Sequence, residues 1–105
     1  METIITIRDG KLTAGERTRL RALGERLKRY FRALIAIEWD FYTTSLDSVA
    51  ICRVKSRTGN YRARAEGKRY GVAMDAAFDK VVRQRLRQRE KMLAKRRITS
   101  IHSSG

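Results

Sequence analysis

The apolar residues change their spacing twice along this chain, and the two changes limit the folds that it can adopt. From Leu20 to Phe31 they return every three or four residues, the period of a helix with one buried face. From Ile35 to Phe41 they alternate, the period of a strand with one buried face. After Lys68 the helical period returns. A chain that carries both periods in this order is expected to form an α+β domain.

Two elements are expected ahead of the alternating segment. Residues 3–8 (TIITIR) are rich in β-branched side chains and predict a short strand, which Asp9-Gly10 ends. Thr13 stands three residues before Glu16, the spacing at which a Thr hydroxyl and a Glu carboxylate accept hydrogen bonds from free amides at a helix start. An amphipathic helix of roughly 20 residues should follow.

Three strands are expected next. The first has an inward-facing series that consists of Ile35, Ile37, Trp39 and Phe41. Residues 48–55 (SVAICRVK) form the second strand, and residues 61–65, whose arginines face outward, form the third. Gly59 followed by Asn60 predicts a hairpin turn between these two strands.

A long second helix is expected from Lys68 to Arg97. Its first half is apolar on one face, whereas its second half has too few apolar residues to be buried and should project from the domain. No proline interrupts it, and about 28 residues would span roughly 42 Å. Residues 99–105 are expected to be a disordered tail, so residues 1–98 form a single domain. The order βαβββα predicts a four-stranded, mainly antiparallel sheet with both helices packed on one face.

Positive charge is concentrated in the C-terminal half of the chain. The formal net charge is +14 and the pI is about 11.1. Residues 1–52 hold 9 Lys or Arg and 7 Asp or Glu, a net +2, whereas residues 53–105 hold 16 and 4, a net +12. Residues 80–97 alone hold 9 basic residues and 1 acid, Glu90. Such a run repels itself unless a polyanion neutralises it, so a polyanionic partner is expected.

The basic residues of the second helix fall into two stripes at the helical angle of about 100° per residue. One stripe consists of Lys80, Arg83, Arg87 and Lys91, and the neighbouring one of Arg85, Arg89 and Arg96. A solvated face normally mixes both signs of charge, and these stripes barely do. Arginine predominates, and its planar fork suits bidentate contacts with phosphate. Other basic residues would strengthen the same field if they lay on the same side of the domain, namely Arg62, Arg64, Arg26, Lys28, Arg29 and Arg32.

The sequence lacks a constellation for catalysis or for a metal. Cys52 is the only cysteine and His102 the only histidine, and there is no Gly-rich phosphate loop. We expect Asp75 and Asp79 to stabilise the first turns of the second helix, with Asp79 paired to Arg83. No enzyme activity, cofactor, metal or small-molecule substrate is predicted. Four side chains that could bind or react are expected in the core instead, namely Cys52, Trp39, Tyr61 and Tyr70.

No apolar run approaches 18 residues, and no export signal precedes the first strand. No membrane partner is therefore expected, and the default location is the cytoplasm.

One segment resembles the ribosome hibernation-promoting factor family, whose members are also called ribosome-associated inhibitor, Y protein and sigma-54 modulation protein. Residues 64–84 (RAEGKRYGVAMDAAFDKVVRQ) resemble that family's pattern of a small residue, Glu and Gly, then an aromatic residue, then Ala-x-Asp-x-x-x-Asp-Lys-hydrophobic-x-Arg-Gln. Residues 27–31 (LKRYF) and the order of the elements add to the resemblance, which extends over residues 3–93.

The resemblance implies a βαβββα fold similar to the double-stranded RNA-binding domain. It also implies binding to rRNA of the small ribosomal subunit, in the channel used by mRNA and tRNA, and silencing of translation under stress or in stationary phase. Off the ribosome we expect a monomer. The sequence departs from the family at DGKLTAGE after the first strand and at Gly24, where the family has a large apolar residue. It resembles a short form without the domain by which long members dimerise ribosomes.

The family's rRNA-contacting positions correspond to Lys80, Arg83, Arg87, Arg89 and Lys91. The full set of candidate rRNA-binding residues adds Arg85, Arg62, Arg64, Arg26 and Arg29.

Two other functions stay open at this point. A general double-stranded RNA-binding module would not prefer intact small subunits to a free RNA duplex. A protein adaptor, such as a transcription-factor modulator, would keep its complexes after ribonuclease treatment. A ribosome-binding factor that neutralises about six to eight phosphates should instead lose affinity by orders of magnitude between low and moderate salt.

Overall fold

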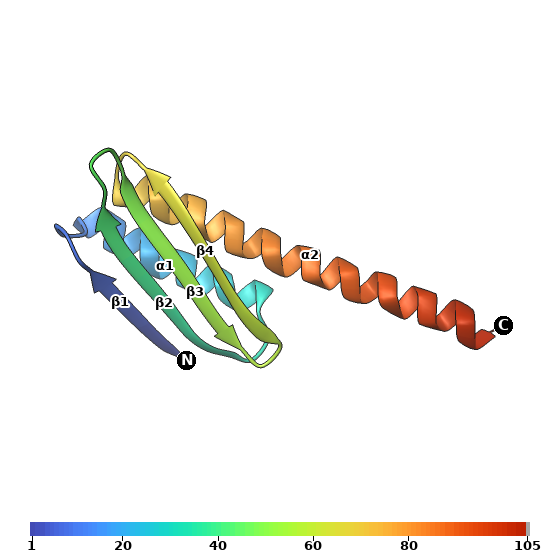
Figure 1. Ribbon diagram of the computed structural model, residues 1–105. Coiled ribbons are helices and arrows are strands. Elements are labelled where there is room, and N and C mark those ends of the chain that lie inside the picture. The colour runs from blue at the N-terminus through green and yellow to red at the C-terminus, as the bar shows by residue number, and fades with distance from the viewer. Residues whose placement is uncertain (105) are drawn as a thin grey trace.

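The structure, a computed structural model, describes the backbone of residues 1–104 and the side chains of residues 1–95. The elements follow the predicted order (Figure 1). They are β1 (Glu2–Ile7), α1 (Ala14–Tyr30), β2 (Leu34–Thr43), β3 (Ser48–Ser56), β4 (Gly59–Gly67) and α2 (Tyr70–Ser104). The α+β class and the βαβββα topology predicted from the sequence are therefore confirmed.

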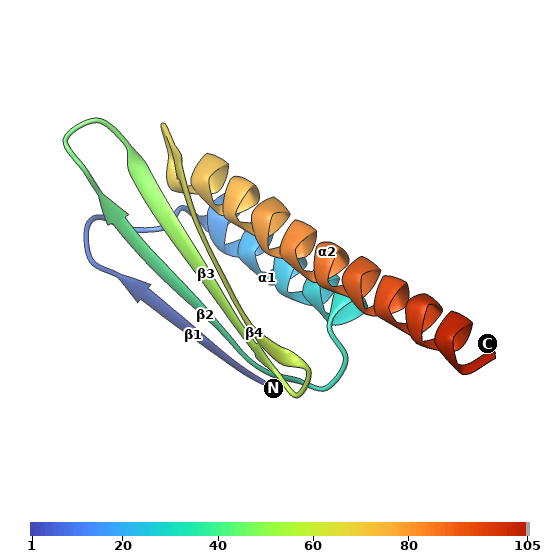
Figure 2. The same ribbon diagram turned by 45° about the vertical axis from the view of Figure 1, so that its right-hand side comes forward.

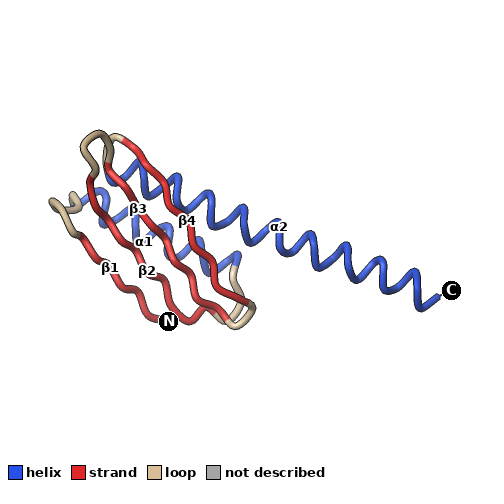
Figure 3. The backbone as a smooth tube through the Cα atoms, viewed as in Figure 1, coloured by secondary structure: helices blue, strands red, loops and turns tan. Residues whose placement is uncertain are grey.

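The four strands form one sheet in the order β1-β2-β3-β4. β1 pairs with β2 in parallel, and the other two pairs are antiparallel. Both helices lie on the same face of the sheet, and the other face is uncovered (Figures 2 and 3). We call the uncovered side the open face. The parallel β1–β2 pair follows from α1, because a parallel connection needs a crossover that is usually helical.

The core lies between the sheet and the two helices. It contains Trp39 and Phe41 from β2, whose rings stack at 6.0 Å between centroids, and Tyr70 from α2, whose ring meets Phe41 edge-on at 5.3 Å. The residues predicted to be in the core are all buried, namely Cys52, Trp39, Tyr61 and Tyr70. None of these side chains is free to contact a ligand at the surface.

Ile35 was predicted to point inward and is 54% exposed. The pairing of β2 with β3 shifts register between Leu34 and Ala36, so Ile35 falls in a β-bulge. A bulge inserts one unpaired residue into the strand, and the inside–outside alternation resumes only after it. The inward series therefore begins at Ile37.

The β3–β4 hairpin turns at Arg57 and Thr58 rather than at the predicted Gly59-Asn60. Gly59 is the first residue of β4 and pairs with Ser56. Its φ of 150° lies in a region that L side chains rarely adopt. The glycine is thus needed just after the turn, where the strand begins.

α1 starts as predicted and ends earlier. The Thr13 hydroxyl accepts a hydrogen bond from the Glu16 amide at 3.0 Å, and the Glu16 carboxylate accepts one from the Thr13 amide at 2.9 Å. The helix has 17 residues rather than about 20, because the backbone leaves helical geometry at Phe31 and Ala33 has a φ of 51°. Phe31 is buried in the core from this position.

The first turn of α2 contains no acidic residue, since Asp75 and Asp79 lie beyond it. Their predicted role at the helix start is therefore wrong. A carboxylate from the other helix takes that place: Glu16 Oε2 accepts a hydrogen bond from the Gly71 amide at 2.7 Å. Asp75 instead forms an ion pair with Arg19 of α1, at 2.9 Å.

α2 projects far beyond the sheet and makes the molecule 60 Å long (Figure 1). Its backbone is helical to Ser104. The division into a domain at residues 1–98 and a disordered tail at residues 99–105 stays a prediction. The sequence contains no proline or glycine between Val72 and Ser104, so nothing local ends the helix. Gly105 lies outside the described residues. Over the described part of the chain, no helix is long and apolar enough to cross a membrane.

Candidate nucleic-acid interface

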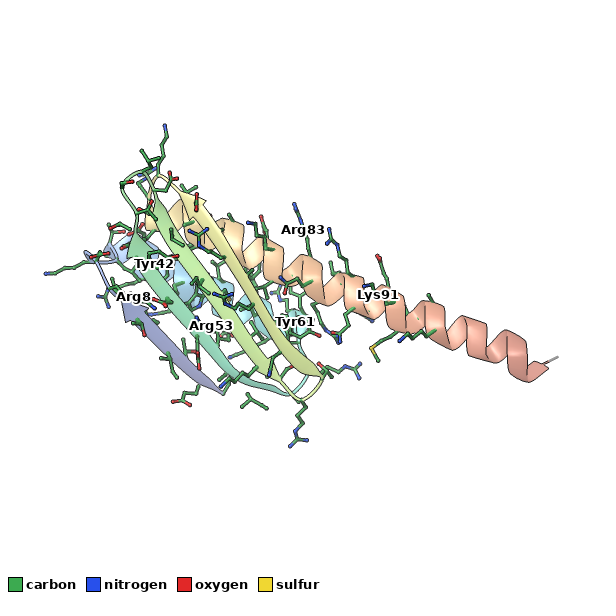
Figure 4. The ribbon with its side chains drawn as sticks, in the orientation of Figure 1. Arg8, Tyr42, Arg53, Tyr61, Arg83 and Lys91 are labelled. Atoms are coloured by element: carbon green, nitrogen blue, oxygen red, sulfur yellow. The ribbon has the colours of Figure 1, made fainter. Side chains whose placement is uncertain are left out.

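One of the two predicted basic stripes lies exposed along α2, and we call it the α2 stripe. It consists of Lys80, Arg83, Arg87 and Lys91, all exposed. Figure 4 shows Arg83 on the part of α2 that still lies beside the sheet and Lys91 on the part that projects from it. The spacing of three and four residues keeps the four side chains on one side of the helix, next to the edge strand β4.

Side chains of α2 tie this side of the helix to β4. Lys80 Nζ donates a hydrogen bond to the carbonyl of Arg64 at 2.9 Å, and Gln84 Nε2 donates one to the carbonyl of Arg62 at 2.8 Å. The Tyr61 hydroxyl donates to Gln88 farther along the helix. The bonds from Lys80 and Gln84 satisfy carbonyls of the edge strand that would otherwise be open to another strand. Lys80 therefore has a structural role in addition to its charge.

The predicted ion pair between Asp79 and Arg83 is absent among residues 1–95. Within the same residues, Arg83 and Arg87 have no side-chain hydrogen bond or ion pair, although both are exposed. Their guanidinium groups can therefore meet a phosphate without first breaking a contact in the protein.

Arg62 and Arg64 lie on the open face, away from both helices. They alternate with the buried residues Tyr61, Ala63 and Ala65, which face the helix layer. Arg64 forms an ion pair with Glu66 at 2.8 Å and donates to the Tyr42 hydroxyl at 3.0 Å. The bond to Tyr42, and then the one to Glu66, raises the pKa of Arg64 above its ordinary value.

Acidic partners neutralise much of the open face. Arg8 pairs with Asp40 at 2.7 Å and lies over the Tyr42 ring, and Lys55 approaches Glu38 at 3.8 Å. The condition that Arg62 and Arg64 share one side with the helix stripes is thus not met. The open face has the mixed charge of a solvated surface.

The remaining predicted residues gather where α1 meets the middle of α2. Arg26 stacks over the Phe78 ring at 4.8 Å, and Arg85 Nε donates to the carbonyl of Tyr30 at 3.1 Å. Arg29 and Arg89 line a hollow between the two helices. The side chain of Arg96, assigned to the same stripe, lies outside the described residues. The ten candidates therefore divide among three surfaces instead of forming one.

Arg53 carries charge that the candidate set missed. It stands directly opposite Arg62 across the β3–β4 pair, and Figure 4 shows it on the open face. Like charges in such a position repel. The alternation of β3 could have placed Arg53 on the same face as Arg62, since both flank inward-facing residues.

The structure offers no metal site, because among the described residues no group of three or more His, Cys, Asp and Glu could hold an ion. Burial raises the pKa of the Cys52 thiol to about 12. A thiol that stays protonated inside the core is a poor nucleophile.

Comparison by sequence finds no matching family model and no matching curated protein. Comparison of structures finds solved proteins of similar fold, and the next two are among them. A ribosomal subunit interface protein from Coxiella burnetii is 18% identical, with 86% of this chain and 99% of that chain covered and a TM-score of 0.67. The Thermus thermophilus Protein Y N-terminal domain is 22% identical, with 81% and 93% covered and a TM-score of 0.68. The chain thus has the fold of the Protein Y N-terminal domain, as the sequence resemblance implied.

Proposed function

We propose that the protein is a non-catalytic factor of the ribosome hibernation-promoting type. It binds rRNA of the small ribosomal subunit in the channel for mRNA and tRNA, and it silences translation under stress. The observation that carries the proposal is the α2 stripe, which is exposed and has no acidic partner among residues 1–95, on a helix that projects from a Protein Y fold.

Shape and charge support binding to a folded RNA. The molecule is 60 × 29 × 18 Å, so the charged half of α2 can enter a channel while the sheet stays outside it. Contacts to phosphates supply most of the affinity of such proteins and carry no base sequence. The open face, where acidic residues pair with Arg8, Lys55 and Arg64, is less suited to this task than the α2 stripe.

Co-sedimentation with ribosomes tests the proposal. The purified protein is centrifuged through sucrose with small subunits, large subunits and whole ribosomes, at low and at moderate salt. We expect one protein per small subunit and per whole ribosome, and none on the large subunit. Absence from all fractions at low salt would contradict ribosome binding.

Charge reversal tests the α2 stripe itself. Arg83→Glu combined with Arg87→Glu should abolish co-sedimentation and leave circular dichroism and the melting temperature nearly unchanged, because neither side chain has an ion pair within residues 1–95 to lose. Arg17→Glu with Arg21→Glu on the exposed side of α1 is the matched control, with the same change in net charge. Normal binding by the folded Arg83/Arg87 variant would exclude the stripe.

Two further measurements address the finer parts of the proposal. Chemical probing of the rRNA should show protection in the mRNA and tRNA channel, and addition of the protein should stop translation in a cell-free system. A free RNA duplex of equal length should compete poorly. Equal competition would instead favour a general double-stranded RNA-binding module.

A further inference from the structure

Four arginines converge on one hollow that RNA binding by the α2 stripe does not use. Arg29 comes from the end of α1, Arg32 from the turn that follows it, and Arg85 and Arg89 from α2. The β3–β4 turn closes one side through Thr58, and the hollow has a volume of about 450 Å³. Figure 2 shows the end of α1 lying alongside the middle of α2, as the bond from Arg85 to the Tyr30 carbonyl requires. We call this hollow the arginine pocket.

The charge in the arginine pocket is uncompensated. None of its lining residues is acidic. Within residues 1–95, Arg29, Arg32 and Arg89 have no ion pair. Arg85 uses Nε for the Tyr30 carbonyl, which fixes its orientation and leaves the two terminal nitrogens to donate. Four guanidinium groups in so small a space repel each other unless an anion joins them.

An apolar wall stands next to the four arginines. Met92 and Leu93 line the pocket and are 48% and 47% exposed. Tyr30, half buried, also lines the pocket. A charged phosphate gains no favourable contact from apolar side chains, whereas a flat aromatic base packs well against Tyr, Met and Leu side chains.

We propose that the arginine pocket binds a free nucleoside polyphosphate, with its phosphates at the four arginines and its base against Tyr30, Met92 and Leu93. The volume falls within the range of about 300–1,000 Å³ that is usual for small-molecule sites. A polyphosphate places several charges on consecutive phosphates, as four clustered arginines require, whereas an RNA strand brings one charge per nucleotide. The proposal does not depend on the proposed function.

Titration calorimetry of the isolated protein at moderate salt tests the proposal with four probes: GTP, ATP, inorganic tripolyphosphate and a single-stranded RNA tetranucleotide. We expect one saturable site for GTP or ATP, and at least tenfold weaker binding of tripolyphosphate and of the tetranucleotide. Tripolyphosphate binding as tightly as the nucleotides would overturn the role of the apolar wall. Binding of the tetranucleotide alone would overturn a free nucleotide as the occupant.

Variants then locate the site. Arg32→Glu with Arg89→Glu should weaken nucleotide binding at least tenfold, whereas Arg17→Glu with Arg21→Glu, which changes the net charge equally outside the pocket, should leave it unchanged. Met92→Ser with Leu93→Ser should weaken GTP or ATP binding several-fold and leave tripolyphosphate binding unchanged. Equal losses in both arginine variants, or no saturable binding by the wild type, would overturn the proposal. Because ribosomes are absent from the assay, failure of ribosome binding would not affect this result.

Discussion

At the scale of single residues, two glycines differ in whether the packing around them leaves room for a side chain. A Cβ on Gly67 would lie 2.7 Å from Val72 Cγ1 and 2.9 Å from the Ala73 nitrogen. The end of β4 therefore approaches the start of α2 more closely than any side chain allows. Gly24 lies inside α1, where a Cβ would meet nothing within 4 Å. Only Gly67 is required by packing.

Alanine substitution should separate the two glycines. Gly67→Ala should lower the free energy of unfolding by about 1–3 kcal/mol, because backbone atoms of α2 must move. Gly24→Ala should raise it by about 0.5–1 kcal/mol, because alanine loses less entropy in a helix. Urea denaturation measures both variants. A destabilised Gly24→Ala together with an unchanged Gly67→Ala would contradict the packing described for both sites.

Titration of the Cys52 thiol makes the free energy of unfolding depend on pH in the alkaline range. Its pKa is raised by burial from 9.0 to about 12, so the folded protein keeps the proton that the unfolded chain loses above pH 9. The contribution of the protonated Cys52 thiol to the free energy of unfolding is fully present below pH 9 and is lost as the pH rises toward 12. Cys52→Ala lacks the titrating group. The stability advantage of the wild type over Cys52→Ala, measured by urea denaturation, should shrink between pH 8 and pH 10.5, and a constant difference would exclude this effect.

At the scale of elements, Glu16 fastens the starts of both helices. One carboxylate oxygen accepts from the Thr13 amide of the α1 cap and the other from the Gly71 amide of α2. Both amides belong to helix ends, where backbone donors lack partners within the helix. A single side chain thereby sets the distance between two elements that are far apart in the sequence.

Removing this carboxylate should destabilise both helix starts. Glu16→Ala is expected to lower the free energy of unfolding by about 2 kcal/mol, since it leaves two backbone donors without acceptors. Glu25→Ala is the control, because Glu25 is exposed and pairs only with Lys28 on the same helix. We expect a loss below about 0.5 kcal/mol there. Similar losses in both variants would argue against the bridge between helices.

At the scale of the whole molecule, the positively charged second half of α2 projects from the packed sheet and helices (Figure 1). The buried side chains of α2 end near Val81. Gln84 and Gln88 still bond to β4, and beyond them α2 projects from the sheet (Figure 1). Hydrophobic burial stabilises the first half of the helix, while the second half presents guanidinium groups to solvent. Separation of these two tasks lets the charged half bind an anion without any change in the core.

Ribosome binding by the charged half of α2 should weaken as the salt concentration rises. The logarithm of the binding constant is expected to fall linearly with the logarithm of salt concentration, by about 0.9 for each phosphate neutralised. Arg83→Gln with Arg87→Gln should therefore reduce the slope by about two. Arg17→Gln with Arg21→Gln should leave it unchanged. An unaltered slope in the first variant would mean that these arginines do not contact phosphate.

The sequence by itself determined the order of the elements, the capping of α1 and the charge of α2. Each of these depends on spacing between neighbours in the chain, which fixes helical or strand period and cap geometry locally. The α2 stripe was predictable for the same reason, since all of its residues lie on one helix. The fold class followed from the same periods.

Only the tertiary structure decided which charges share a surface. The Lys80 side chain donates a hydrogen bond to the backbone carbonyl of Arg64. The Arg64 side chain nevertheless lies on the open face, where it pairs with Glu66. Arg29 and Arg89 line the same pocket because the end of α1 lies alongside α2. The Glu16 bridge to Gly71 likewise depends on how the helices cross the sheet. Contacts between elements depend on packing geometry, and neither period nor composition contains that information.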